Sequence, residues 1–146
     1  MKVYLDNCCY NRPYDDQSLM RVSLETQAKI HVQDLIKEEK LNLVSSFILH
    51  YENSQNPFES RKRAILKFIA DNSSQYVSEA EFDEVHCIAE EIMKSGIKTK
   101  DALHVACAIF AGCDVFLSTD YRLLKLKTDK IRILNPIEFI MESEEQ

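Results

Sequence analysis

The sequence predicts an α/β domain of three layers, with a mostly parallel central sheet between helices. Short apolar runs alternate with long helical patterns along the chain, and the turns between them are short. The segment 114–118 has the apolar centre of a strand inside a parallel sheet. The segment 102–111 is apolar nearly all round, as in a helix that is buried on most of its surface.

The first half of the chain is expected to hold two strands and three helices. Ser18 is a plausible N-cap for a long helix without Gly or Pro, and Ser45 or Ser46 for the next one. Pro57 stops that second helix because the residue before a proline disfavours helical geometry. The expected elements are a strand at 2–5, a polar loop at 10–18, a helix at 19–40, a strand at 41–44, a helix at 47–53 and a helix at 58–71.

The second half continues the alternation. Ser78 with Glu81 three residues later forms a capping box pattern for a helix, and Gly96 and Gly112 are placed to end helices. The expected elements are an extended link at 75–77, a helix at 79–95, a helix at 102–111, a strand at 114–118, a short helix at 121–126, a strand at 131–134 and a terminal helix after Pro136.

Length and composition predict one domain. The chain has 146 residues and a mass of 17.0 kDa, enough for one hydrophobic core. We assign residues 1–141 to the domain and 142–146 to a short, solvated acidic tail. The five cysteines lack the spacing of a zinc site or a disulfide ladder and are expected to be reduced and mostly buried. No apolar run reaches the ~18 residues of a membrane span, so a cytoplasmic location is expected.

The net charge bears on possible partners. A formal charge of -6 and a pI near 5.2 argue against nucleic-acid binding by bulk electrostatics. This argument weakens if part of the negative charge is gathered at one place to hold cations and basic clusters lie around it. The run Arg61, Lys62 and Arg63 is such a basic cluster.

Four acids stand where strands end or where helix patterns face the core. Asp6 and Asp120 follow apolar strands, although each could simply make a turn or cap the next helix. Glu52 lies on the apolar side of its helix, where pairing with a Lys or Arg is the alternative. Asp101 follows Thr99, a natural N-cap, and could merely favour the helix dipole.

Taken together, these acids favour a metal site, because two strand ends and two helix positions would meet at one edge of a parallel sheet. Unpaired like charges repel there by about 4 kcal/mol per pair at ~4 Å and an effective dielectric constant near 20. Divalent cations would remove that repulsion. All-oxygen ligands select Mg²⁺ or Mn²⁺ over zinc, and one or two such ions suit phosphoryl chemistry.

Four sequence blocks resemble, in order and spacing, the acidic blocks of the PIN domain. The blocks are Val-Tyr-Leu-Asp at 3–6, the helix from Ser45-Ser46 to Glu52, Lys-Thr-Lys-Asp-Ala-Leu-His-Val-Ala at 98–106 and Phe-Leu-Ser-Thr-Asp at 116–120. The resemblance implies an α/β/α sandwich and a Mg²⁺- or Mn²⁺-dependent ribonuclease whose products carry 5′-phosphate and 3′-hydroxyl ends. Many small members of the family are the toxins of VapBC-type toxin–antitoxin pairs, which implies an antitoxin partner and, by default, a homodimer.

The resemblance also assigns roles to residues. Asp6, Glu52, Asp101 and Asp120 would be the metal-binding acids. Further polar residues would support them: Ser118 or Thr119 would orient Asp120 or a water molecule, and Asn7 stands where many members carry Thr or Ser.

Other side chains are weaker candidates. His104 lies three residues after Asp101, but a core histidine with one hydrogen bond is the favoured interpretation. Arg12 and the run 61–63 could contact phosphate backbone, although solvated charge is the better expectation. No Gly-rich phosphate loop occurs, which argues against a P-loop nucleotide site.

Three other functions remain open at this point. A haloacid-dehalogenase-type phosphatase needs a second Asp two residues after the first, where this chain has Cys8. A phospho-accepting receiver domain needs an acceptor Asp and a Lys on strands where we find neither. The remaining alternative is a PIN-fold module that binds RNA or protein without catalysis.

Overall fold

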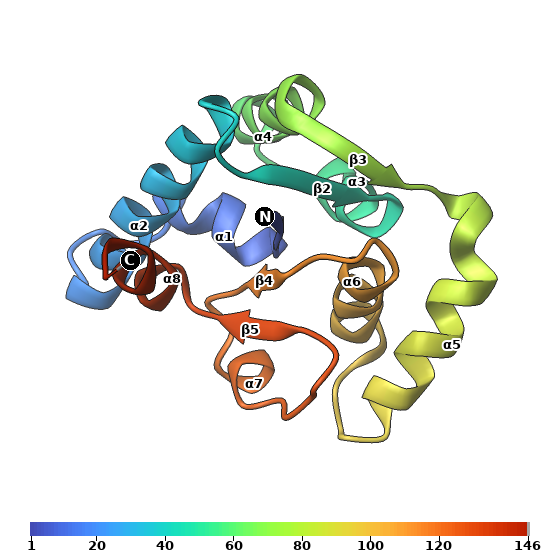
Figure 1. The fold of residues 1–146 in the computed structure, drawn as a ribbon. Coiled ribbons are helices and arrows are strands. Elements are labelled where there is room, and N and C mark those ends of the chain that lie inside the picture. The colour runs from blue at the N-terminus through green and yellow to red at the C-terminus, as the bar shows by residue number, and fades with distance from the viewer. Residues whose placement is uncertain (146) are drawn as a thin grey trace.

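The fold is a central parallel sheet between two layers of helices (Figure 1). The computed structural model describes residues 1–145. All strand pairs are parallel, in the order β3-β2-β1-β4-β5. The strands are β1 (Lys2–Leu5), β2 (Asn42–Ser46), β3 (Ser73–Val77), β4 (Val115–Leu117) and β5 (Arg132–Leu134). The prediction of a three-layer α/β fold is confirmed.

The strand order creates a switch point beside β1. From β1 the chain adds β2 and β3 on one side, then returns to add β4 and β5 on the other. In open α/β sheets, ligands bind outside the carboxyl ends of the strands at such a point. The residues that follow β1 and β4 therefore flank the expected ligand position.

Helices cover both faces of the sheet. Helices α5 and α6 pack with α7 on one face, and α1, α2, α4 and α8 pack on the other, as Figure 1 shows. The helices are α1 (Asn7–Asn11), α2 (Met20–Lys37), α3 (Phe47–Ser54), α4 (Glu59–Asn72), α5 (Phe82–Met93), α6 (Thr99–Phe110), α7 (Tyr121–Leu124) and α8 (Pro136–Glu144), with 3₁₀ turns η1 (Arg12–Tyr14) and η2 (Glu79–Glu81).

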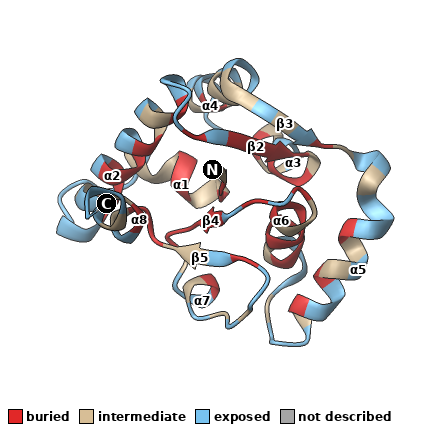
Figure 2. Ribbon diagram, viewed as in Figure 1, coloured by how far each residue is buried: buried red, intermediate tan, exposed pale blue. Residues whose placement is uncertain are grey.

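Burial follows the apolar pattern of the sequence. Helix α6 is buried along residues 102–108, as Figure 2 shows, and β4 is buried at all three positions. These two elements are the ones whose continuous apolar runs predicted an interior position. None of the helices in residues 1–145 is long and apolar enough to span a membrane.

The N-terminal turn region differs from the expectation. Residues 7–11 form α1 and residues 12–14 a 3₁₀ turn, where a polar loop from residue 10 was expected. The buried Cys9 and Tyr10 pack into the core between α1 and the sheet. The long helix begins at Met20 with Leu19 as its N-cap, so the prediction for Ser18 was wrong.

Two other end predictions need correction. Ser78 makes no side-chain cap, and Glu81 itself is the N-cap of α5, so the capping box does not form. The tail was assigned to residues 142–146, but residues 142–144 form the last turn of α8. Glu142 pairs there with Arg132 of β5 at 2.8 Å. Gln146 lies outside the described residues.

The cysteines agree with the prediction. All five are free thiols. Three of them are buried, Cys8 is partly buried and Cys87 is exposed.

Candidate active site

Asp6 and Asp120 follow the neighbouring strands β1 and β4 at the switch point. Asp6 accepts a hydrogen bond from the backbone N–H of Asn7 at 2.8 Å. Asp120 accepts one from the backbone N–H of Arg122 at 2.9 Å. Both acids therefore cap the short helix that follows them, as the alternative interpretation expected. This role leaves one Asp120 carboxylate oxygen without a partner in residues 1–145.

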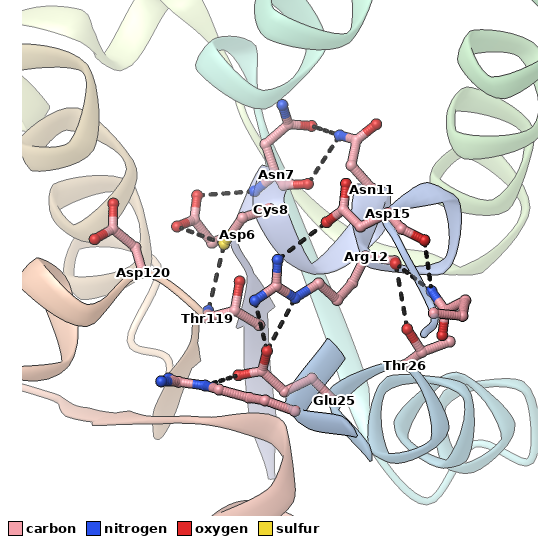
Figure 3. A network of polar contacts seen from close by, with 12 residues as sticks. Asp6, Asn7, Cys8, Asn11, Arg12, Asp15, Glu25, Thr26, Thr119 and Asp120 are labelled. Carbon is pink, nitrogen blue, oxygen red and sulfur yellow. Dashed lines mark hydrogen bonds and ion pairs between the residues drawn. The ribbon is translucent and has the colours of Figure 1, made fainter. Parts of the chain in front are cut away.

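Ser118 joins these two acids. Its hydroxyl donates to Asp6 Oδ2 at 2.9 Å and accepts from the backbone N–H of Asp120 at 3.0 Å. Cys8 Sγ also lies 3.3 Å from Asp6 Oδ2 and accepts from the backbone N–H of Thr119 at 3.3 Å (Figure 3). Of the supporting residues predicted here, Ser118 acts through its side chain and Thr119 through its backbone.

Glu52 reaches the same edge from α3. Helix α3 begins at the end of β2, where the Ser46 hydroxyl accepts from the backbone N–H of Leu49 at 3.2 Å. The Glu52 side chain is 17% exposed and contacts His104 Nε2. Its other oxygen accepts from Asn7 Nδ2 at 3.1 Å. The sequence left open a Lys or Arg partner for Glu52, but within residues 1–145 its partners are a histidine and an asparagine amide.

A buried polar chain lies behind Glu52. His104 is fully buried, and its Nδ1 lies 2.7 Å from the Tyr4 hydroxyl. That hydroxyl lies 2.6 Å from Ser46 Oγ. The sequence interpretation gave His104 one hydrogen bond, whereas the structure gives it a partner at each ring nitrogen. The chain thus ties strand β1, the α3 cap and helix α6 to the Glu52 carboxylate.

Asp101 lies in the first turn of α6. The N-cap is Lys98, so the expectation that Thr99 has this role was wrong. Burial raises the pKa of Asp101, and the charges of Asp120 and Glu52 raise it further. His104, one turn further along α6, contacts Glu52, so Asp101 lies on the part of α6 that meets Glu52.

Asp6 is the most deeply buried of the four acids. Its residue exposure is 5%, and burial raises its pKa well above the ordinary value, with Cys8 adding to the increase. Within residues 1–145, no Lys or Arg forms an ion pair with any of the four carboxylates. Lys98 and Lys100 act on Asp101 and Glu52 only from a distance. Within the described residues, the four carboxylates therefore have no Lys or Arg in direct contact, and Glu52 has His104 as its basic partner.

This charge and the oxygen donors fit a divalent cation in their chemistry. The geometry is more open than a finished coordination shell: in residues 1–145, no three His, Cys, Asp or Glu side chains stand close enough together to hold a metal ion. The hydrogen bonds of Asp6 and Glu52 hold those carboxylates on the protein rather than on a common centre. The prediction of metal ligands at these four positions stays a prediction.

The predicted phosphate-binding residues occupy different surroundings. The Arg12 guanidinium is held by Glu25 at 2.6 Å and Asp15 at 3.0 Å, as Figure 3 shows. Arg63 pairs with Glu59 at 3.2 Å. Arg61 and Lys62 form no ion pair with residues 1–145. Arg61 lines the same pocket as Glu52. Of the four basic residues predicted to bind phosphate, it is therefore the one that lies beside a predicted metal-binding acid.

Sequence reasoning missed Tyr4 and Cys8 as neighbours of the acids. Tyr4 stands two residues before Asp6 on the same side of the extended chain, because side chains alternate along a strand. That spacing was the available signal. Cys8 lies on helix α1, which the sequence analysis did not predict. The hydrophobic pattern therefore gave no indication that Cys8 contacts Asp6.

Comparison with solved structures identifies the fold. A chain in the crystal structure of VapBC2 from Rickettsia felis bound to a DNA fragment from their promoter matches with a TM-score of 0.57 and 14% sequence identity. The match covers 92% of this chain and 98% of that chain. The chain has a PIN-like fold. No protein-family model matches the sequence, and no curated protein matches it.

The alternation of strands and helices predicted the three-layer sheet, and the four acidic blocks predicted that it is PIN-like. At 14% identity the match establishes the arrangement of the helices and strands. It leaves the chemistry to be argued from the residues of this chain, because one fold can carry different functions.

Proposed function

We propose that this chain is a metal-dependent endoribonuclease that hydrolyses RNA phosphodiester bonds. The observation that carries the proposal is the placement of four carboxylates at one edge of the sheet of a PIN-like fold, with no Lys or Arg ion pair to any of them within residues 1–145. Keeping several acids together without a Lys or Arg counter-ion costs stability, so their presence at this edge favours a cationic ligand there.

Each acid has a role in the proposal. Asp6, Glu52, Asp101 and Asp120 would hold one or two Mg²⁺ or Mn²⁺ ions. When bound, such ions activate water and neutralise charge on the phosphate oxygens. The protein holds Asp6 through the Ser118 hydroxyl and Glu52 through His104 and Asn7. By the family resemblance, the products would carry 5′-phosphate and 3′-hydroxyl ends.

The test is cleavage of RNA by the purified protein with Mn²⁺, with EDTA as the metal-free control. We expect Asp6→Asn and Asp101→Asn to abolish cleavage with the fold intact. Asp129→Asn is a matched control, because it makes the same chemical change at an exposed position with no hydrogen bond in residues 1–145. Unchanged turnover in Asp6→Asn or Asp101→Asn would overturn the proposed site. Tight RNA binding without cleavage by the wild type would favour a binding module instead.

An antitoxin partner is the further part of this proposal. The solved structure that matches this fold contains VapBC2 with DNA from their promoter, which supports a toxin-like role in a two-protein system. A small DNA-binding protein encoded beside this chain should copurify with it and suppress its RNA cleavage. A homodimer is the default expectation for the chain itself, and light scattering of the purified protein would measure it.

A further inference from the structure

A polar pocket opens beside Glu52, between α1 and the turn that joins α3 to α4. Its volume is about 270 Å³. The lining side chains are mainly neutral: four carboxamides, one proline and one aromatic ring accompany a single acid and a single base. They are Asn7, Asn11, Glu52, Gln55, Asn56, Pro57, Phe58 and Arg61.

Three of the carboxamides form a chain that starts at Glu52. Asn7 Nδ2 donates to Glu52 at 3.1 Å, Asn11 Nδ2 donates to Asn7 Oδ1 at 3.2 Å and Asn56 Nδ2 donates to Asn11 Oδ1 at 3.4 Å. The chain ends where the backbone N–H of Phe58 donates to Asn56 Oδ1 at 3.0 Å. Figure 3 shows its Asn7 and Asn11 members.

The two ends fix the direction of this chain. An ionised carboxylate can only accept, so Asn7 must present its NH₂ group to Glu52. A backbone N–H can only donate, so Asn56 must present its oxygen to Phe58. Every amide between them is then oriented in one way. Asn11 uses both of its N–H hydrogens, on the backbone oxygen and on Oδ1 of Asn7. Within residues 1–145, Asn7 and Asn56 each donate one hydrogen bond, so each has one N–H left for a ligand.

An aromatic ring and a guanidinium complete the pocket. The Phe58 side chain is exposed by 53%, although a ring of this size is usually buried. The Arg61 guanidinium lies 3.9 Å from the Phe58 ring centroid and 5.0 Å from that of Tyr14. No carboxylate in residues 1–145 forms an ion pair with Arg61. These two side chains therefore offer a stacking surface and unused donors within reach of the acid cluster.

These features match an unpaired nucleobase better than a phosphate. A phosphate would meet the Glu52 carboxylate with only one cation to offset the repulsion. A base is neutral, stacks on aromatic rings or on guanidinium planes, and exchanges hydrogen bonds with amides along its edge. The surplus of donors favours an edge that carries acceptors, as guanine does with N7 and O6.

We propose that this pocket binds an unpaired base of the RNA strand, next to the phosphate that is cut. The inference rests on the proposed ribonuclease function and adds a cause of substrate selection to it. The protein would then prefer single-stranded or looped RNA, because a base inside a duplex cannot enter the pocket. Phe58 and Arg61 would bind the base, and the carboxamide chain would read its edge.

Binding in EDTA tests the pocket without requiring catalysis. Fluorescence anisotropy of a labelled single-stranded RNA gives the dissociation constant for each variant. We expect Phe58→Ala and Arg61→Ala each to weaken binding about tenfold, as loss of one base stack does. The controls are Tyr76→Ala, which removes a ring of equal 53% exposure from β3, and Arg63→Ala, which makes the same change of charge two residues away. Both controls should bind within about twofold of the wild type.

An abasic nucleotide provides the matching change in the RNA. Placed beside the cleaved phosphate, it should weaken wild-type binding as much as Phe58→Ala does, and Phe58→Ala should then weaken binding no further. Equal binding of abasic and intact RNA by a wild type that cleaves RNA would overturn the pocket and leave the ribonuclease proposal standing. If the wild type binds RNA without cutting it, abasic substitutions along the strand test the pocket separately. Absence of both binding and cleavage would overturn both proposals.

Discussion

His104 contacts the Glu52 carboxylate through Nε2, and 52 residues separate the two in the sequence. Because the other ring nitrogen meets the Tyr4 hydroxyl at 2.7 Å, the imidazole cannot turn without losing both contacts. His104 is therefore a positioning residue for Glu52 in the proposed site. The same relationship explains why a histidine stands in an otherwise apolar, buried helix, where an unpartnered polar group would be costly.

Tyr4→Phe tests the buried chain. The change removes one hydroxyl and leaves Ser46 Oγ and His104 Nδ1 without that partner. We expect the free energy of unfolding to fall by about 1–3 kcal/mol, the usual cost of an unsatisfied buried group. Urea denaturation followed by circular dichroism measures it. An unchanged midpoint would mean that the hydroxyl contributes nothing to the fold.

Asp6→Asn should stabilise the metal-free protein at neutral pH. Burial raises the pKa of Asp6 in the folded protein, so the folded state binds more protons than the unfolded state between the two pKa values. Stability contributed by this group therefore falls as the pH rises through that window. Asn removes the charge and still caps α1. Urea melts in EDTA at pH 7 should show the gain, and melts below the unfolded pKa of Asp should show it disappearing.

Glu52→Gln should change the stability of the folded protein in the opposite direction at neutral pH. Burial alone would raise the pKa of Glu52, but the hydrogen bond and charge of His104 outweigh it, and the net shift is downward. A lowered pKa means stability that is present above the unfolded pKa and is lost as the pH falls through the folded one. The variant should be less stable than the wild type at pH 7, and the difference should shrink in acid. A stabilised Glu52→Gln at pH 7 would contradict the role of His104.

The sequence predicted the elements that are long or uniformly apolar. Helix α6 and strand β4 were found because their runs had no polar face, and the strand-end acids because parallel strands end at a common edge. Helix α1 was missed because five residues are too few to show a helical period, and short helices depend on tertiary packing. Its buried Cys9 and Tyr10 supply that packing.

Contacts between residues that are far apart in the chain could not be predicted from a single sequence. The contacts of Glu52 with His104 and of Arg12 with Glu25 depend on how α3, α6, η1 and α2 lie together. The four acids were predicted from position, and the structure brings them to one edge. Their role as metal ligands stays a prediction, because chemistry at a site is argued separately from the fold.

Arg12→Ala tests a structural role for an arginine first considered for RNA binding. The Glu25 side chain is fully buried and meets Arg12 at 2.6 Å, with Asn135 as a further partner. Removing Arg12 leaves a buried charge with less compensation, so we expect a loss of about 3 kcal/mol in the free energy of unfolding. Arg63→Ala breaks an exposed pair and should change stability little. Equal, small effects of the two substitutions would contradict a structural role for Arg12.

Divalent ions should stabilise the folded protein if the acids bind them. A ligand that binds only the folded state adds RT ln(1 + [L]/Kd), about 2.7 kcal/mol at a concentration of 100 Kd. Thermal melts with increasing Mg²⁺ give this directly, and Mg²⁺ is preferable to softer ions because the five cysteines of the unfolded chain bind it weakly. We expect Asp101→Asn to remove most of the increase, since Asp101 makes no hydrogen bond or ion pair within residues 1–145 and is free to bind a cation. Asp129→Asn should keep the full increase in stability with Mg²⁺.

An equal increase in all three proteins would place the bound ion elsewhere on the surface. No increase in the wild type would contradict the proposed metal site.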